Sequence, residues 1–254
     1  MDGKALYDEL RTLARSLGIT DIGVASAGMW ETDDLVKRTT FPVERPSAIL
    51  PGARSVIILG VPVQRTILAT TPSTYYSDHS RNVNAVEDIA AQRLVMELII
   101  RGHAAVSVAR DGYQWNEELR LQTSSFFSHR HAAYLAGMGT FGVNNMILTE
   151  RYGPRIRLAS LITTAELPSG IPLDKQLCTK CMRCVSKCPV NATVSVLYPD
   201  GITDKKRCVG RATVLRSAAT NPCAICTFVC PVGADFNDPM PEDDAVSNIR
   251  RYAN

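Results

Sequence analysis

The chain has 254 residues and a formal net charge of +3, with 28 lysines and arginines against 25 aspartates and glutamates. Its apolar fraction of 45% and charged fraction of 21% are those of an ordinary folded chain of one or two domains, and the small charge does not call for a nucleic-acid partner. The opening MDGKAL contains neither the apolar core of a signal peptide nor a twin arginine, and no apolar run could span a membrane. We therefore expect no membrane association and a cytoplasmic location.

Hydrophobic periodicity in the first two thirds of the chain predicts alternating helices and strands. Leucines at helical spacing (Leu6, Leu10, Leu13, Leu17) mark the first helix, which Gly18 ends. In chain order we expect a helix at 4–17, a strand at 21–26, a loop to 52, a buried strand at 55–63, a polar loop at 64–82, a helix at 84–101 with Val86, Ile89, Ala90, Leu94 and Leu98 on one stripe, a strand at 103–109, a helix at 128–135, and strands at 146–149 and 156–164. This pattern predicts an α+β domain with helices packed on a sheet.

A Pro- and Gly-containing linker at 167–172 separates this region from a cysteine-rich segment. We expect one domain over 1–167, a second over 173–235 and a C-terminal tail over 236–254.

All eight cysteines lie in the last third of the chain. Four form a C-x-x-C-x-x-C-x-x-x-C-P run, three form a second run that also ends in C-P, and one stands between the runs; they are Cys178, Cys181, Cys184, Cys188, Cys208, Cys223, Cys226 and Cys230. This spacing is typical of a bacterial-ferredoxin-like domain with two 4Fe–4S clusters, which transfer single electrons. Zinc sites seldom use three cysteines at two-residue gaps followed by C-P, and disulfides would need an export signal.

The ligands can be divided into two sets of four. In two-cluster ferredoxins the cysteine before the proline ligates the other cluster. The first set is therefore Cys178, Cys181, Cys184 and Cys230, and the second set is Cys188, Cys208, Cys223 and Cys226. A regular tandem pattern would have a cysteine three residues before Cys223. Thr220 stands there, so we assign the missing ligand to Cys208.

Other motifs leave alternatives open. Gly137, Gly139 and Gly142 form a G-x-G-x-x-G string, but a helix precedes it and a strand follows, which excludes a dinucleotide site. These glycines should allow a tight turn and a close approach of the backbone to a neighbouring strand or a planar cofactor. His129 and His131, two residues apart on a helix, do not face the same way. Either could bind an anion with its neighbour in the sequence, Arg130, or simply cap and pack.

Several segments resemble epoxyqueuosine reductases and, through them, the superfamily that includes the corrinoid-dependent reductive dehalogenases. Residues 130–142 (RHAAYLAGMGTFG) resemble their R-x-x-A-x-x-A-G-x-G-W-x-G-K stretch, residues 50–57 (LPGARSVI) their L-P-x-A-x-S-V-I stretch, and Asp78-His79 their D-Y-H. The cysteine layout is similar as well. The resemblance implies a nitroreductase-like α/β sandwich that holds cobalamin, followed by two clusters that pass electrons to its cobalt.

Candidate pocket residues follow from the motifs above together with the resemblance. For cofactor binding they are Tyr75, Tyr76, His79, Arg130, Gly137, Gly139, Gly142 and Asn144, and for catalysis Tyr134 and His129. The tyrosines and His79 are predicted to lie in a loop, where ordinary packing is an equal alternative.

Three departures separate this chain from those enzymes. No carboxylate occurs in residues 121–125, where a proton-donating aspartate is expected, the Trp and Lys of the glycine turn are lost, and the chain stops soon after the clusters, like a short form without the C-terminal helical repeats that grip tRNA. We therefore expect a reductase that takes electrons from a donor such as ferredoxin or flavodoxin and acts on a small molecule or a corrinoid protein rather than tRNA. The alternatives are a shortened epoxyqueuosine reductase with Tyr134 or His129 as proton donor, and a non-catalytic electron carrier.

Overall fold

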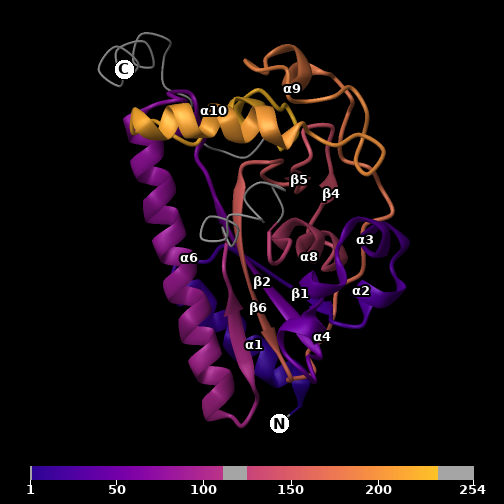
Figure 1. The fold of residues 1–254 in the computed structure, drawn as a ribbon. Coiled ribbons are helices and arrows are strands. Elements are labelled where there is room, and N and C mark those ends of the chain that lie inside the picture. Colours follow the sequence, from indigo (N-terminus) through magenta and orange to yellow (C-terminus); the bar gives the residue numbers. More distant parts are fainter. Residues whose placement is uncertain (1, 111–124, 234–254) are drawn as a thin grey trace. The chain divides into compact units, whose positions relative to one another are not determined.

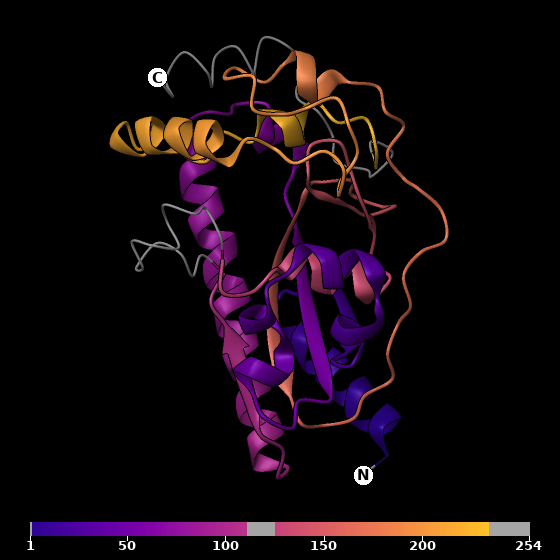
Figure 2. The same ribbon diagram turned by 45° about the vertical axis from the view of Figure 1, so that its right-hand side comes forward.

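The computed structural model describes residues 2–110 and 125–233, which form two compact units (Figures 1 and 2). The sheet unit comprises Met1–Val61, Ala85–Gly139 and Leu158–Asp174, and the cysteine unit comprises Pro62–Asn84, Thr140–Arg157 and Lys175–Asn254. Three long elements contribute residues to both units, so each unit is discontinuous in sequence. The predicted domain limits at 167 and 173 follow the chain instead, and they stay a prediction.

The sheet unit is built on a four-stranded sheet in the order β1-β2-β6-β3. Strand β1 (Asp21–Ser26) runs antiparallel to β2 (Ser55–Pro62), and β3 (Ala105–Val108) runs antiparallel to β6 (Ile156–Thr163). In these pairs Val24 lies opposite Ile57, and Val106 lies opposite Ile162. All four strands were predicted from their apolar runs, within two residues at each end.

Helices cover both faces of this sheet (Figures 1 and 2). Helix α1 (Gly3–Ser16) buries Leu6, Leu10 and Ala14 in one core with Val24 of β1 and with Leu94 of α6 (Thr74–Ile100). The neighbouring residue Gly23 faces the other side, because a Cβ there would meet Ala136 and Met138, which follow α8 (His129–Leu135). Alternation of side chains along the strand therefore places α1 and α6 on one face and α8 on the other.

Helix α6 is longer than predicted. It begins at Thr74, ten residues before the expected start, so Tyr75, Tyr76 and His79 lie on a helix and the predicted loop is wrong. Polar residues on its exposed side hid the periodicity, although Tyr76 and Val83 are buried at helical spacing. The predicted apolar stripe is also wrong at Ile89, which is 59% exposed.

The predicted loop before residue 52 contains four short helices. They are α2 (Met29–Thr32), α3 (Asp34–Thr39), the 3₁₀ helix η1 (Pro42–Glu44) and α4 (Pro46–Ile49). None has more than six residues, so none shows a helical period in the sequence. Local signals explain them afterwards: the Asp33 carboxylate caps the Val36 amide at 2.9 Å, and proline begins both η1 and α4.

The cysteine unit contains little regular structure. Its elements are α5 (Arg65–Leu68), the first turns of α6, the antiparallel pair β4 (Thr140–Phe141) and β5 (Ile147–Leu148), α9 (Arg183–Ser186), α10 (Lys205–Ser217) and α11 (Ile225–Phe228). Short helices α9 and α11 pack against each other, and α11 packs against α5. Across the described residues, no helix has the length and apolar character needed to cross a bilayer.

The glycine string follows a helix and leads into strand β4, in the order that excludes a dinucleotide site. Gly137 has a φ of +71°, and a Cβ there would collide with the carbonyl oxygen of Ile171. Gly170, one residue earlier in the linker, approaches Ala136 just as closely. The close approach in the sheet unit is therefore to the backbone of the linker segment, and it requires the absence of a side chain.

Gly137 and Gly102 offer a matched test of this contact. Both have positive φ, but a Cβ on Gly102 would meet nothing within 4 Å. We expect Gly102→Ala to lower the free energy of unfolding by about 1–2 kcal/mol, the cost of a left-handed alanine. Gly137→Ala should cost clearly more, because it adds a steric clash. Urea unfolding followed by circular dichroism measures both losses, and equal losses would show that the linker contact contributes nothing.

Candidate iron–sulfur site

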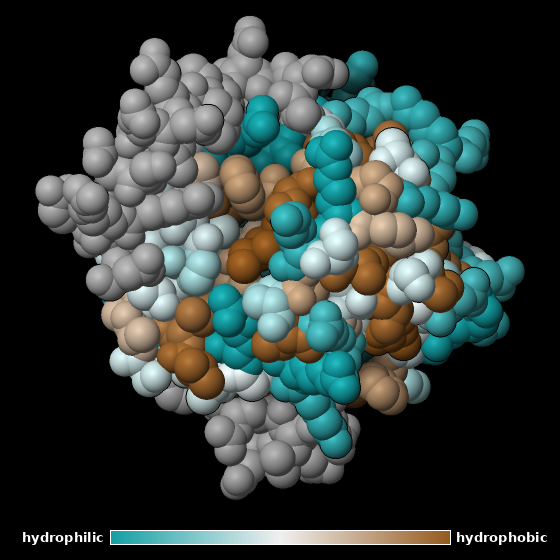
Figure 3. Space-filling model, turned by 90° about the horizontal axis from the view of Figure 1, so that it is seen from above, coloured by the Kyte–Doolittle hydropathy of each residue, from teal (hydrophilic) through white to brown (hydrophobic). Residues whose placement is uncertain are grey.

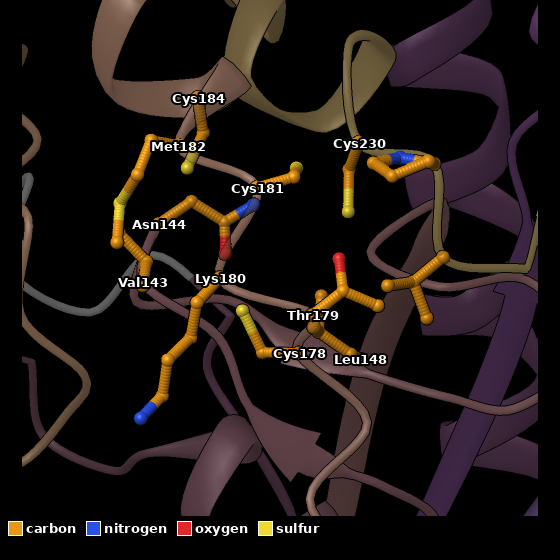
Figure 4. Close-up of a pocket in the computed structure, with 12 residues that line it drawn as sticks. Val143, Asn144, Leu148, Cys178, Thr179, Lys180, Cys181, Met182, Cys184 and Cys230 are labelled. Atoms are coloured by element: carbon orange, nitrogen blue, oxygen red, sulfur yellow. The ribbon is translucent and has the colours of Figure 1, made fainter.

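The four thiols of the predicted first set surround one cavity in the cysteine unit (Figure 4). Cys178 and Cys181 come from the loop that leads into α9, Cys184 lies on α9 itself, and Cys230 follows α11. Figure 4 shows the sulfur atoms of Cys178, Cys184 and Cys230 pointing into the same space. Segments about fifty residues apart in the sequence thus bring thiols to one cavity; that these thiols ligate one cluster, as the ligand-crossing rule predicts, stays a prediction.

The electrostatics of Cys184 connect the same four residues. Burial, followed by the proximity of Cys230, Cys178 and Cys181, raises the pKa of the Cys184 thiol to about 11. A thiolate here is disfavoured unless positive charge enters the cavity. Metal ions supply that charge and displace the thiol protons on binding.

The second set shows a similar coupling. Burial, followed by the proximity of Cys208, Cys223, Cys184 and Cys188, raises the pKa of the Cys226 thiol to about 12. Three of these four neighbours are its predicted co-ligands. Cys208 lies on α10 and is exposed, whereas Cys226 is partly buried.

The two cysteine runs form an internal repeat. After Cys181, Met182 adopts a left-handed conformation (φ +58°) and caps α9, and Cys188-Pro189 follows. After Cys223, Ala224 adopts the same conformation (φ +48°) and caps α11, and Cys230-Pro231 follows. Left-handed non-glycine residues cost about 1–3 kcal/mol and persist only where the surroundings hold them. The strain is thus repeated at the same place in both loops.

Thr220 occupies the position at which this repeat would have a further cysteine. It is buried, and both its amide (2.9 Å) and its hydroxyl (3.3 Å) donate to the carbonyl of Leu215 near the end of α10. Thr220 therefore ties down the helix that carries Cys208. This geometry agrees with the assignment of Cys208 as the displaced ligand, which stays a prediction.

The cavity fits a cluster better than a single ion. Zinc with four thiolates at about 2.3 Å would draw the sulfurs to one point. Among residues 2–110 and 125–233, no three His, Cys, Asp or Glu side chains are grouped around a position for one metal ion. The four thiols instead line the wall of the cavity. A 4Fe–4S cubane has four iron corners that each take one thiolate, so the donor set matches it.

Hydrogen bonds to sulfur favour the thiolate form of Cys188. Burial raises its pKa, but the amides of Ala192, Val190 and Thr193 and the Thr193 hydroxyl outweigh burial and bring the pKa below its usual value. The Ala192 amide lies 3.2 Å from the sulfur. Because amides that point at sulfur stabilise negative charge, the turn after Pro189 prepares Cys188 to bind metal.

Two arginines that sequence reasoning missed support the cysteines. Arg155, which is 1% exposed, donates to the carbonyls of Cys230 (3.1 Å), Val232 (3.2 Å) and Gly233. Arg211 donates through Nε to the sulfur of Cys223 at 3.1 Å. Each lies at least twelve residues from its partner in sequence, so no short motif could have revealed either contact.

Tyr76 lies beside the second set of cysteines. It is 3% exposed and packs with Val63 and Leu68. Burial raises the pKa of its hydroxyl; the charge and hydrogen bond of Arg157 lower it, and Cys226 and Cys223 raise it. Tyr75, by contrast, is half exposed.

Two further predicted pocket residues belong to the cysteine unit. Asn144 lines the first-set cavity and donates to the carbonyl of Cys226 at 3.3 Å, so it contacts both cysteine sets. Burial and Arg157 lower the pKa of His79, so its imidazole is neutral at physiological pH, although Asp78 opposes the shift. Within the described part of the chain, the buried Nε2 of His79 has no hydrogen-bond partner.

The remaining candidates lie in the sheet unit on or after α8. His129 Nδ1 bonds with the Ser160 hydroxyl at 2.9 Å. The two nitrogens of His131 bond with the hydroxyls of Thr39 (3.0 Å) and Ser128 (2.6 Å), so the two histidines face different partners, as expected. Arg130 is partly buried.

Tyr134 and the remaining glycines complete the predicted site. Tyr134 is partly buried on α8, and burial and a hydrogen-bonded Asp33 raise the pKa of its hydroxyl. Gly139 and Gly142 are buried on either side of β4. Residues 121–124, where a catalytic carboxylate was looked for, lie outside the described residues. The pocket candidates fall in both units, so their grouping into one pocket stays a prediction.

Comparison with known proteins agrees with the cysteine pattern. A family model described as a 4Fe-4S binding domain matches residues 171–193. The epoxyqueuosine reductase of Lactococcus garvieae is 24% identical over 96% of this chain and 76% of its own length. That of Bacillus subtilis is 23% identical over 93% of this chain and 68% of its own length.

Solved structures show the same fold. A crystal structure of epoxyqueuosine reductase with a modified tRNA-Tyr stem loop matches 94% of this chain and 68% of its own, with a TM-score of 0.57 and 21% identity. The catabolic reductive dehalogenase NpRdhA in complex with 3-bromo-4-hydroxybenzoic acid matches 99% of this chain and 36% of its own, with a TM-score of 0.66 and 16% identity. The resemblance to these two groups of proteins is confirmed, and the chain is shorter than either.

Serine substitutions test the division into two ligand sets. Cys226→Ser should remove one cluster and about half of the iron per chain. Cys208→Ser/Cys226→Ser should lose no more than the single variant, because both ligands belong to one cluster. Cys184→Ser/Cys226→Ser should lose nearly all the iron. Iron and sulfide analysis after anaerobic purification measures this, and an equal loss in both double variants would refute the assignment.

Proposed function

We propose that this chain is an iron–sulfur reductase that passes electrons through two 4Fe–4S clusters to a corrinoid and reduces an epoxyqueuosine-type nucleoside. The observation that carries the proposal is the first-set cavity, which is lined by four thiols from two distant segments, the number that one cluster requires. The epoxyqueuosine reductases, matched over more than nine tenths of this chain, favour this substrate over the small molecule that the sequence first indicated.

The residues of the cysteine unit would hold and insulate the clusters. Each cluster takes or gives one electron, whereas reduction of an epoxide consumes electrons in pairs together with protons. Two single-electron deliveries are therefore needed for each turnover. The corrinoid, which rests on the resemblance alone, would supply the low-valent cobalt that attacks the substrate.

The proton for the substrate has two candidate sources in the sheet unit. Tyr134 keeps its proton at neutral pH because burial and Asp33 raise its pKa. His129 is buried and bonded to Ser160. Neither is a carboxylic acid of the kind named in the solved Bacillus subtilis epoxyqueuosine reductase, which has an aspartate in its catalytic loop.

This difference favours a second candidate function, reduction of a small molecule. The sequence from 121 to 125 has no carboxylate. The fold also matches the dehalogenase that was solved with a brominated hydroxybenzoate.

Anaerobic reconstitution tests these functions in sequence. The purified chain receives cobalamin and is reduced, and its visible and EPR spectra are recorded. A base-off cobalt(II) signal beside two reduced clusters supports the corrinoid reductase. Turnover is then measured with an epoxyqueuosine-containing stem loop and with a panel of brominated phenols. This comparison distinguishes a tRNA substrate from a small-molecule substrate. Two clusters without cobalt binding would refute the proposal and favour an electron carrier.

The surface charge of the cysteine unit indicates the kind of electron donor. Residues 175–233 hold nine lysines and arginines against two aspartates, a charge of +7, while the rest of the chain sums to −4. Lys180, Arg183 and Lys187 are exposed on and around α9, near the exposed Cys181. Among the described residues, these three cations have no ion-pair partner. Such a surface would steer an acidic carrier, such as ferredoxin or flavodoxin, toward the first cluster.

The surface of the cysteine unit offers more than charge. Figure 3, which looks onto the side where α9 and α10 lie, shows apolar patches among hydrophilic side chains. Val196, Ile202 and Val214 of the cysteine unit are each about half exposed or more. An apolar centre with a polar rim is the usual anatomy of a transient protein interface.

Charge reversal tests this donor surface. Lys180→Glu/Arg183→Glu/Lys187→Glu should lower the rate at which a reduced flavodoxin reduces the clusters at least tenfold at low salt, because steering is lost. The matched control, Lys4→Glu/Arg15→Glu/Lys37→Glu in the sheet unit, changes the net charge equally and should have little effect. Stopped-flow absorbance measures both rates, and dithionite reduction checks that the clusters are intact. Unchanged flavodoxin kinetics with lost binding of a tRNA stem loop would instead assign this surface to RNA.

A further inference from the structure

Helix α10 brings two groups to the second set of cysteines. Cys208 and Arg211 are three residues apart, so they share one face of the helix. The Nε of Arg211 lies 3.1 Å from the sulfur of Cys223. The helix that replaces the missing ligand at position 220 thus also delivers a cation to a neighbouring ligand.

A hydrogen bond from a guanidinium to a thiolate is charge-assisted, and it strengthens as the sulfur becomes more negative. Reduction of a 4Fe–4S cluster adds one electron that is shared with its ligand sulfurs. A donor aimed at a ligand sulfur therefore stabilises the reduced state more than the oxidised state. Hydrogen bonds to sulfur and net charge are among the main determinants of cluster potential.

Other donors reach the same set. The Ala192 amide lies 3.2 Å from the sulfur of Cys188, and Thr193 also contributes to it. In the first set, the buried cation Arg155 donates to the carbonyl oxygen of Cys230. A bond to a carbonyl fixes the loop, whereas a bond to sulfur acts on the cluster itself, so Arg211 and Arg155 differ in kind.

We propose that Arg211 is a positioning residue that raises the reduction potential of the second cluster and leaves that of the first unchanged. This role rests on the proposed two-cluster relay. The step concerned is the one-electron reduction of the cluster by a low-potential carrier protein. Arg211 stays protonated throughout, and no proton is transferred. The second cluster thereby becomes easier to reduce than it would be without this bond.

A purely structural role is the competing interpretation, since Arg211 could simply anchor α10. The midpoint potential separates the two roles, because an anchor changes occupancy or stability without shifting the potential of a cluster that remains bound. Arg216, exposed on the same helix, provides the control.

The experiment is an EPR-monitored redox titration of the full, anaerobically purified chain and its variants. Cys184→Ser, which retains only the second cluster, first assigns one of the two potentials to that cluster. Arg211→Leu should then shift this potential negative and leave the other in place. Arg211→Lys, which keeps the charge but not the Nε donor, should shift it less. Arg216→Leu should shift neither.

The possible failures are distinguishable. A wild-type chain with about half of the expected iron and one signal would refute the two-cluster relay itself. Two clusters whose potentials are unmoved by Arg211→Leu, or moved equally, would overturn the role of Arg211 and leave the relay intact. If the leucine variant loses iron, Arg211→Gln, which keeps an N–H donor without charge, replaces it. Loss of the second cluster in all three Arg211 variants would make the residue an anchor and would also overturn the proposal.

Discussion

The cysteine unit must hold several thiols around one small cavity, although each thiol disfavours the ionisation of its neighbours. Much of the unit is arranged to meet this requirement. The thiols of Cys184 and Cys226 are stable only as neutral groups when nothing positive is near them. The protein nevertheless brings them together through two strained left-handed residues and a buried arginine that grips the Cys230 loop. The unit has few regular elements of its own, so much of its stability should come from the bonds between thiolates and iron.

The sequence predicted the features that depend on local pattern. The division of the cysteines into two ligand sets rests on their spacing and stays a prediction, whereas the strands of the sheet unit and helix α1 follow from the hydrophobic period of the sequence. It failed where the pattern was short or masked by polar residues. Helices α2 to α4 are too brief to show a period, and the first turns of α6 carry Tyr75 and Asp78 on an exposed side. Arg155 and Arg211 could not be found, because a hydrogen bond between distant segments leaves no trace in spacing.

The structure also changes the interpretation of several polar residues. Tyr76 and Asn144, which were expected to line a corrinoid pocket, lie in the cysteine unit: Tyr76 packs with Val63 and Leu68 near Cys226, and Asn144 donates to the carbonyl of Cys226. His131 and His129 bond with hydroxyl groups of the sheet unit, an arrangement that by itself serves packing. The Thr220 side chain secures the end of the helix that carries Cys208, the predicted replacement for the ligand that is absent at position 220.

Each ligand set contains one exposed cysteine, Cys181 in the first and Cys208 in the second, while the other six are partly buried. Oxygen, peroxide and chelators reach a cluster through its most accessible corner, since the oxidation of cysteine follows exposure and thiolate character. The lifetime of this protein in air should therefore be set by these two corners and not by the six partly buried cysteines. Oxidative damage would begin at Cys208 on α10 and at Cys181 in the loop before α9, where a bound cluster would be most exposed to solvent.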